Sequence, residues 1–163
     1  MAESRHISAD PGDTRKTFEA ILTRALRSKG NLFTLAKCAK QLGLGIVEQR
    51  AQDRVSGTSV ITDIDRGRAL WNVIEEAIDR LRPADLEPAP TPAWRLYSIV
   101  SGFYVQGKPV NELAAELGIS PRTLYRERQT AVEALFTVIW QIEQQRHLLP
   151  SRDDAEDLES QRQ

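Results

Sequence analysis

The chain has 163 residues, of which 40% are hydrophobic and 28% charged, so it can bury the core of one compact domain or two very small ones. The net charge is −1 at pH 7 and no stretch is strongly basic, so charge alone does not indicate binding to polyanions, which weakens a nucleic-acid function without excluding it. Cys38 is the only cysteine, and His6 and His147 are the only histidines, which excludes an intramolecular disulfide and a zinc site built from His and Cys.

The rest of the composition predicts a helical, cytoplasmic protein without catalytic activity. No apolar run is long enough to cross a bilayer, and the first residues lack the apolar run of a signal peptide. No pairing of a nucleophile with a base and no phosphate loop is evident, so we expect no enzyme, no metal and no cofactor. Abundant Ala, Leu, Arg, Glu and Gln favour helices over strands.

The N-terminal half predicts a disordered arm followed by helices. Residues 1–13 are polar and are expected to form the arm. Apolar residues then recur at three-and-four spacing in a first helix that ends at Gly30. The same spacing predicts a second helix, which Asn31 would cap and Gly43 would end.

The next stretch, GLGIVEQRAQDRVSGTSVIT, has no sustained period and predicts a loop with room for one short helix. A third helix is expected to begin near Asp63 or Asp65 and to end before Pro83. Together these segments predict a three-helix N-terminal unit over residues 14–82.

The four prolines from Pro83 to Pro92 cannot continue a helix, and they predict an extended linker over residues 83–91. After the linker, the apolar spacing predicts helices from about Pro92 to Val105, from Val110 to Leu117 and from Pro121 to about Arg146. The acidic end, residues 148–163, lacks an apolar face and is expected to be a disordered tail. The predicted fold class is therefore all-α: the N-terminal unit packs on a C-terminal domain over residues 92–147 that ends in a long helix.

The segment LAAELGISPRTLYRERQTAVEAL, residues 113–135, is interrupted in the way typical of a helix-turn-helix. Gly118 supplies a turn residue that tolerates positive φ, and Ala114 is small where the two helices would approach each other. Ser120 would cap the second helix, and Pro121 fits its first turn. Four apolar residues are expected to fix the crossing of the two helices: Leu113, Leu117, Ile119 and Leu124.

The longer segment WRLYSIVSGFYVQGKPVNELAAELGISPRTLYRERQTAVEAL resembles the promoter-reading C-terminal domain, region four, of bacterial sigma factors and related transcription regulators. The resemblance covers roughly residues 92–140 and is carried by ELAAELGIS with Thr123, Leu124 and Ala131. The chain departs from that family at Arg128, where an apolar residue is usual, and at GKPV, where a Ser-type cap is usual. The N-terminal half also lacks the aromatic-rich segment with which sigma factors open DNA strands, so we do not expect a complete sigma factor.

The resemblance implies that the second helix enters the major groove of double-stranded DNA. The residues that it implies as facing the DNA are Ser120, Arg122, Thr123, Tyr125, Arg126 and Gln129. Arg122 or Arg126 would bind guanine bidentately, and Gln129 would read adenine. Lys108 and Arg128 would contact phosphates, which position the protein without specifying sequence. The alternative interpretation is that these arginines form a solvated helix face.

Two functions from different classes follow from these patterns. The leading interpretation is a sequence-specific, DNA-binding bacterial transcription regulator. The alternative is a protein-interaction module that uses the helix-turn-helix scaffold to dock RNA polymerase, a sigma factor or a signalling partner, which the near-neutral charge favours.

Two further patterns concern packing. The helix over residues 121–146 has an apolar surface wider than one stripe, so we expect it to bury against the N-terminal unit and against the same helix of a second chain. The alternative is a monomer in which Trp71 and its neighbours cover this helix.

The segment LAKCAKQLGLGIVEQ imitates the first half of the helix-turn-helix motif, but Gln49 falls where an apolar residue is needed. We therefore expect a core helix that ends in Gly, not a second DNA reader.

Overall fold

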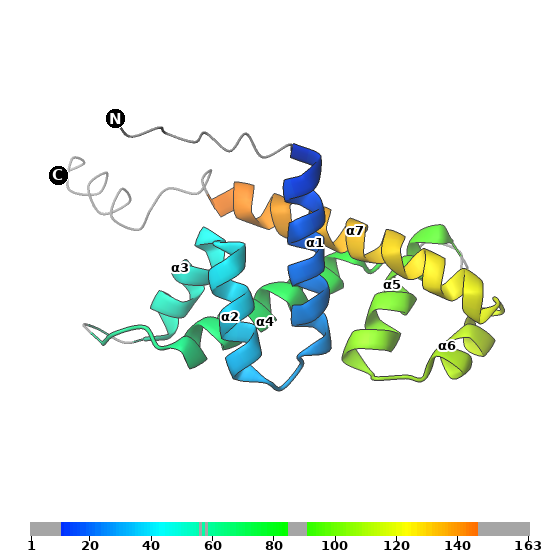
Figure 1. Cartoon of the computed structure of the whole chain (residues 1–163), viewed down its shortest axis with the longest axis horizontal. Helices are drawn as coiled ribbons and strands as arrows, with labels where there is room; N and C mark the ends of the chain where they lie inside the picture. The colour runs from blue at the N-terminus through cyan, green and yellow to red at the C-terminus, as the bar shows by residue number, and fades with distance from the viewer. Residues whose placement is uncertain (1–10, 56, 58, 85–90, 147–163) are drawn as a thin grey trace, which may run out of the picture.

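The computed structural model describes residues 11–55, 57, 59–84 and 91–146, and its regular elements are all helices (Figure 1). No strand occurs in these ranges, which confirms the all-α prediction. The arm before residue 11, most of the Pro-rich linker and the tail over 148–163 lie outside the described residues. None of the described helices combines the length and the apolar character that a bilayer span requires.

The described part of the N-terminal unit has four helices, so the prediction of three was wrong. They are α1 (Pro11–Arg27), α2 (Leu32–Leu42), α3 (Gly45–Arg54) and α4 (Asp63–Leu81). Residues 11–13 belong to α1 and not to the arm, because Pro11 suits the first turn of a helix and Asp13 complements the positive end of the helix dipole. The short helix for which the aperiodic stretch had room is α3.

Helix α3 has a cap that no local pattern indicates. Leu44, at its N-cap position, makes no side-chain cap hydrogen bond. Instead, the Glu143 carboxylate of α7 (Pro121–Arg146) accepts hydrogen bonds from the backbone N–H groups of Gly45, at 3.0 Å, and Ile46, at 2.8 Å. Because this cap comes from the other end of the chain, α3 depends on tertiary packing for its start.

The predicted ends of α2 and α4 are confirmed by their caps. The Asn31 side chain accepts a hydrogen bond from the Thr34 N–H at 3.1 Å, and Gly43 ends α2 in the left-handed conformation at φ 60°. Helix α4 begins with a capping box in which Thr62 and Asp65 each accept a hydrogen bond from the other's backbone N–H. These caps explain why local sequence predicted both helices well.

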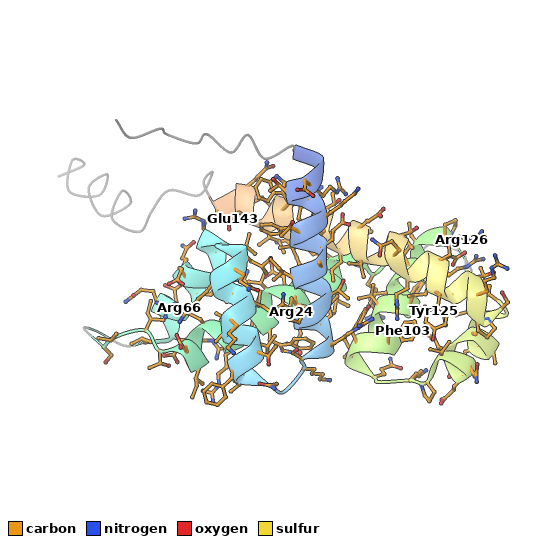
Figure 2. The ribbon with its side chains drawn as sticks, in the orientation of Figure 1. Arg24, Arg66, Phe103, Tyr125, Arg126 and Glu143 are labelled. Atoms are coloured by element: carbon orange, nitrogen blue, oxygen red, sulfur yellow. The ribbon has the colours of Figure 1, made fainter. Side chains whose placement is uncertain are left out.

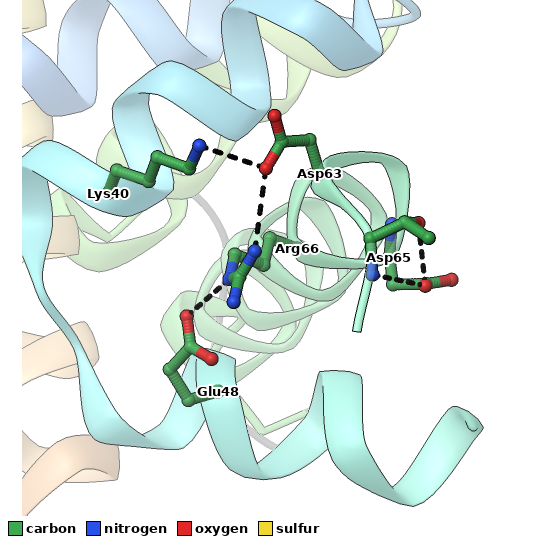
Figure 3. A network of polar contacts seen from close by, with 6 residues as sticks. Lys40, Glu48, Asp63, Asp65 and Arg66 are labelled. Carbon is green, nitrogen blue, oxygen red and sulfur yellow. Dashed lines mark hydrogen bonds and ion pairs between the residues drawn. The ribbon is translucent and has the colours of Figure 1, made fainter. Parts of the chain in front are cut away.

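Ion pairs join the start of α4 to α2 and α3 (Figure 3). The Asp63 carboxylate lies 2.9 Å from the Lys40 ammonium of α2, and Arg66 of α4 lies 2.7 Å from Glu48 of α3. The hydrogen bond and charge of Lys40 hold the pKa of the Asp63 carboxyl below its ordinary value. The pairs are largely exposed, so they orient the three helices more than they stabilise them.

The C-terminal helices begin and end where the sequence predicts. Helix α5 (Pro92–Val100) continues as the π-helix η1 (Ser101–Val105), followed by α6 (Val110–Leu117) and α7. The wide turn of η1 is the one difference from the predicted helix over 92–105. It carries Gly102, at which a Cβ atom would lie 2.7 Å from Leu113 Cδ1, so a glycine allows η1 to approach α6 closely.

One hydrophobic core joins the two halves of the chain. Helix α7 runs along the molecule, packs on α3, α4, α5 and α6, and is crossed by α1 near its middle (Figure 1). Leu70 and Ile74 of α4, Ile99 of α5, and Leu124 and Leu135 of α7 are all fully buried. The predicted packing of the N-terminal unit on the C-terminal domain is therefore confirmed, and the core does not divide at the Pro-rich linker.

The wide apolar surface of α7 is largely covered by helices of the same chain. Its residues Ala131, Leu135, Ile139 and Ile142 are buried, whereas Trp140 keeps 45% of its surface exposed. Trp71, expected to cover α7 in a monomer, lines a cleft beside α2 with Leu32 and Leu35. The homodimer through α7 stays a prediction, and its contact would have to include Trp140.

Candidate nucleic-acid interface

Helices α6 and α7 are joined by the predicted tight turn. Gly118 ends α6 in the left-handed conformation, at φ 65°, and the Ile119 N–H donates to the Ala114 carbonyl at 3.0 Å. Leu113, Ala114 and Leu124 are buried where the helices meet. The predicted turn and its apolar contacts are thus present, and they hold the start of α7 beyond the end of α6.

The first turn of α7 is capped by its own Ser120. The Ser120 hydroxyl accepts a hydrogen bond from the Thr123 N–H at 3.1 Å, and the two hydroxyls lie 2.9 Å apart. The predicted cap is therefore confirmed. One of the two hydroxyls donates to the other, so one O–H remains free to bind an outside acceptor.

Two arginines stand exposed on the first turns of α7. Arg122 and Arg126 are four residues apart, so they lie on one face of the helix, and Tyr125 between them keeps 50% of its surface exposed. Neither arginine makes an ion pair or hydrogen bond with another residue that the structure describes. Arg126 lies at the end of the molecule that is opposite to α3 (Figures 1 and 2).

Arg128 stands where the resemblance to region four leads one to expect an apolar residue, and its guanidinium lies near two aromatic rings. Its guanidinium carbon lies 5.5 Å from the centre of the Phe103 ring of η1 and 5.1 Å from that of Tyr125. Figure 2 labels Phe103 and Tyr125 in the part of the molecule formed by η1 and the start of α7. The side chain is half-buried, and the expected phosphate contact stays a prediction.

Lys108 and Gln129 each contact an acidic side chain of the chain itself. The Lys108 ammonium donates to both oxygens of Glu116, at 3.1 and 2.7 Å, which offsets its charge within the domain. The Gln129 amide lies 3.5 Å from a Glu19 oxygen of α1, where α1 crosses α7. The structure therefore gathers Ser120, Arg122, Thr123, Tyr125 and Arg126 at the start of α7, and Gln129 is exposed on the next turn of the same helix. Lys108 lies outside α7, and its predicted contact with phosphate stays a prediction.

Two further cations lie beside this surface, and no sequence pattern predicted them. Arg27 and Lys29, at the end of α1, line a cleft together with Arg128 and Tyr104. Burial raises the pKa of the Tyr104 hydroxyl, and the nearby charges of Arg128 and Arg27 oppose that rise. About a hundred residues separate these cations from Arg128 along the chain, so no local motif indicates the cluster.

The pair of α2 and α3 has a similar left-handed glycine between its helices, and its second helix differs in one decisive way. The Glu143 carboxylate occupies the start of α3, and Ile46 and Val47 are buried there. A groove of DNA cannot approach a helix start that is filled by the protein's own side chain. The prediction of a core helix ending in Gly43 is confirmed for α2, which buries Leu35 and Ala39.

No protein-family model, curated protein or solved structure was found to match the chain. The resemblance to region four therefore depends on the residues of 92–140 alone and stays a prediction. What the chain does must be inferred from the geometry and charge of the exposed start of α7.

Proposed function

We propose that the chain is a sequence-specific, DNA-binding transcription regulator of the bacterial, region-four-like kind, which reads the major groove with the first turns of α7. The observation that carries this proposal concerns Arg122 and Arg126, which are exposed at the start of α7. Neither has an ion pair within the described residues, and α7 begins directly after the tight turn at Gly118. A helix held in this way can enter the groove, since no other described helix covers its first two turns on that face.

The chemistry of the pair suits base recognition. A guanidinium offers parallel N–H donors that match the O6 and N7 acceptors of guanine, and each such pair is worth about 1–3 kcal/mol of discrimination. Because Arg122 and Arg126 are one helical turn apart, about 6 Å, they would reach neighbouring base pairs. One of the Ser120 and Thr123 hydroxyls, and the hydroxyl of the exposed Tyr125, would donate to backbone phosphates, which set the register.

The protein-interaction alternative is favoured by the acids near this surface. Glu116 offsets Lys108 and Glu19 engages Gln129, so two of the side chains expected at the DNA are occupied within the chain. With a net charge of −1, electrostatic attraction to DNA is weak overall. In that case the same surface would dock RNA polymerase, a sigma factor or another regulator.

Selection of random duplex DNA by the full chain at a stated salt concentration separates the two functions. We expect an enriched sequence, and we expect Arg126→Ala to weaken its binding by about 1–3 kcal/mol, roughly 5- to 150-fold, with relaxed preference at one base pair. Arg68→Ala is the matched control, because Arg68 is an exposed arginine on α4, away from this surface. If no sequence is enriched, or if Arg126→Ala weakens every duplex equally, α7 does not read bases.

A further inference from the structure

A cleft of about 410 Å³ lies where the end of α1 meets η1 and α7. Its lining includes Arg27, Lys29, Phe103, Tyr104, Gly107 and Arg128. Three of the lining residues are cations and none is acidic. Its volume is in the range of clefts that bind small molecules.

The three positive charges are not neutralised by any carboxylate that the structure describes. Arg27 is exposed and has no hydrogen bond or ion pair in the described ranges. The Lys29 ammonium donates to the Val105 carbonyl at 2.7 Å, which orients it without offsetting its charge. The Arg128 guanidinium rests on the Phe103 and Tyr125 rings. Like charges held around one cleft repel each other, and an anion between them would relieve that repulsion.

The Tyr104 hydroxyl is a second, independent sign of a ligand. Tyr104 is 8% exposed and lines the cleft, yet its hydroxyl has no hydrogen-bond partner among the described residues. Buried polar groups are normally paired, so an unpaired hydroxyl beside a cleft indicates a partner that comes from outside the chain. Burial raises the pKa of this hydroxyl above its ordinary value, and a phenolic O–H can donate to an anionic acceptor.

We propose that this cleft binds a phosphate group, held by the Arg27, Lys29 and Arg128 cations and by the Tyr104 hydroxyl. A phosphate offers several acceptor oxygens and up to two negative charges, which match several donors better than one carboxylate does. The group can belong to a free phosphorylated molecule or to the backbone of DNA beside α7. The inference does not require that α7 reads bases.

The test for a free phosphorylated molecule uses the full chain without DNA. Inorganic phosphate is titrated while the amide resonances of Lys29 and Gly107 are followed by NMR. We expect saturable shifts, and Arg27→Gln should weaken binding about 10-fold or more, because hydrogen bonds to charged groups are strong. Arg24→Gln is the matched control, since it removes an exposed arginine from the same helix outside the cleft.

Tyr104→Phe separates a ligand-binding hydroxyl from a structural one. It removes a hydroxyl without a described partner and keeps the ring, so the melting temperature should stay unchanged or rise while phosphate affinity falls. A fall in melting temperature without loss of phosphate affinity would contradict the proposal.

The test for a backbone phosphate measures the affinity for a fixed DNA duplex against salt concentration. If the group comes from DNA, Arg27→Gln should lower the salt slope by about one and Arg24→Gln should not. Saturable phosphate binding supports the site as one for a free phosphorylated molecule, and this change of slope supports it as one for a DNA phosphate. Absence of both, or equal effects of Arg27→Gln and Arg24→Gln, overturns it. A failure of base reading by α7 leaves the phosphate titration unaffected.

Discussion

At the scale of single residues, close contacts decide which side chains are allowed. Gly67 of α4 is buried where α4 crosses α2. A Cβ atom there would lie 2.7 Å from the Leu32 carbonyl oxygen and 3.3 Å from the Ala36 nitrogen. Both neighbours are backbone atoms, so they cannot move without shifting α2. The glycine sits in the middle of a helix, where it is otherwise unfavourable, because the crossing leaves no room for a side chain.

We therefore expect Gly67→Ala to lower the free energy of unfolding by about 1–3 kcal/mol, since overpacking outweighs the gain in helix propensity of about 1 kcal/mol. Urea unfolding measures the change. Gly45→Ala is the matched comparison, because the three atoms nearest to its Cβ would all belong to the far end of the flexible Arg146 side chain, which can move. An alanine variant at 67 that is as stable as the parent would show that α2 and α4 do not cross so closely.

At the scale of elements, the free backbone N–H groups at three helix starts find their hydrogen-bond acceptors in three different ways. Helix α4 begins with a capping box, and α7 is capped by the Ser120 hydroxyl. Helix α3 is capped by the Glu143 carboxylate, which belongs to α7. In the capping box, hydrogen bonds from the Thr62 hydroxyl and backbone N–H hold the pKa of the Asp65 carboxyl below its ordinary value of 3.8. The ionised form is thus favoured in the folded state.

This lowered pKa predicts how the stability of α4 depends on pH. A carboxyl with a lower pKa when folded contributes stability above its unfolded pKa and loses it as pH falls through the folded pKa. Asp65→Asn removes that contribution, so the difference in unfolding free energy between parent and variant should be full above about pH 4 and should shrink at lower pH. Denaturant unfolding at several pH values measures it. A difference that stays constant down to pH 2 would contradict the role of the charge.

At the scale of the whole molecule, α7 connects the candidate interface to the N-terminal unit. Arg126 and Glu143 lie near its opposite ends (Figure 2). Between them, α7 buries Leu135 and Ile139 against the other helices. The start of α7 is therefore held by a core to which both halves of the chain contribute.

Glu143→Ala should show this connection as a loss of stability. It removes the cap of α3 and leaves the Gly45 and Ile46 N–H groups without their acceptor, so we expect a loss of about 1–2 kcal/mol in thermal or urea unfolding. Gln144→Ala, at the exposed neighbouring position, should change stability by less than about 0.5 kcal/mol. Equal effects of the two substitutions would mean that the Glu143 carboxylate does not hold the end of α7 to the start of α3.

The sequence by itself determined the features that depend on neighbours within a turn or two. The left-handed glycines at 43 and 118, the caps at Asn31 and Ser120, and the bounds of α6 and α7 were all predicted, because backbone φ and cap hydrogen bonds are local. The five residues gathered at the start of α7 share one helix, so their proximity also followed from periodicity.

Only the tertiary structure decided the features that join distant segments. The cap of α3 comes from Glu143, the Arg128 guanidinium rests on Phe103, and Arg27 reaches the cleft only because α1 crosses α7. The contacts of Lys108 with Glu116 and of Gln129 with Glu19 also depend on packing, and the roles predicted for these two residues at the DNA stay predictions. Such contacts depend on how the helices pack, and a single sequence records which faces are apolar but not which neighbour each face will meet.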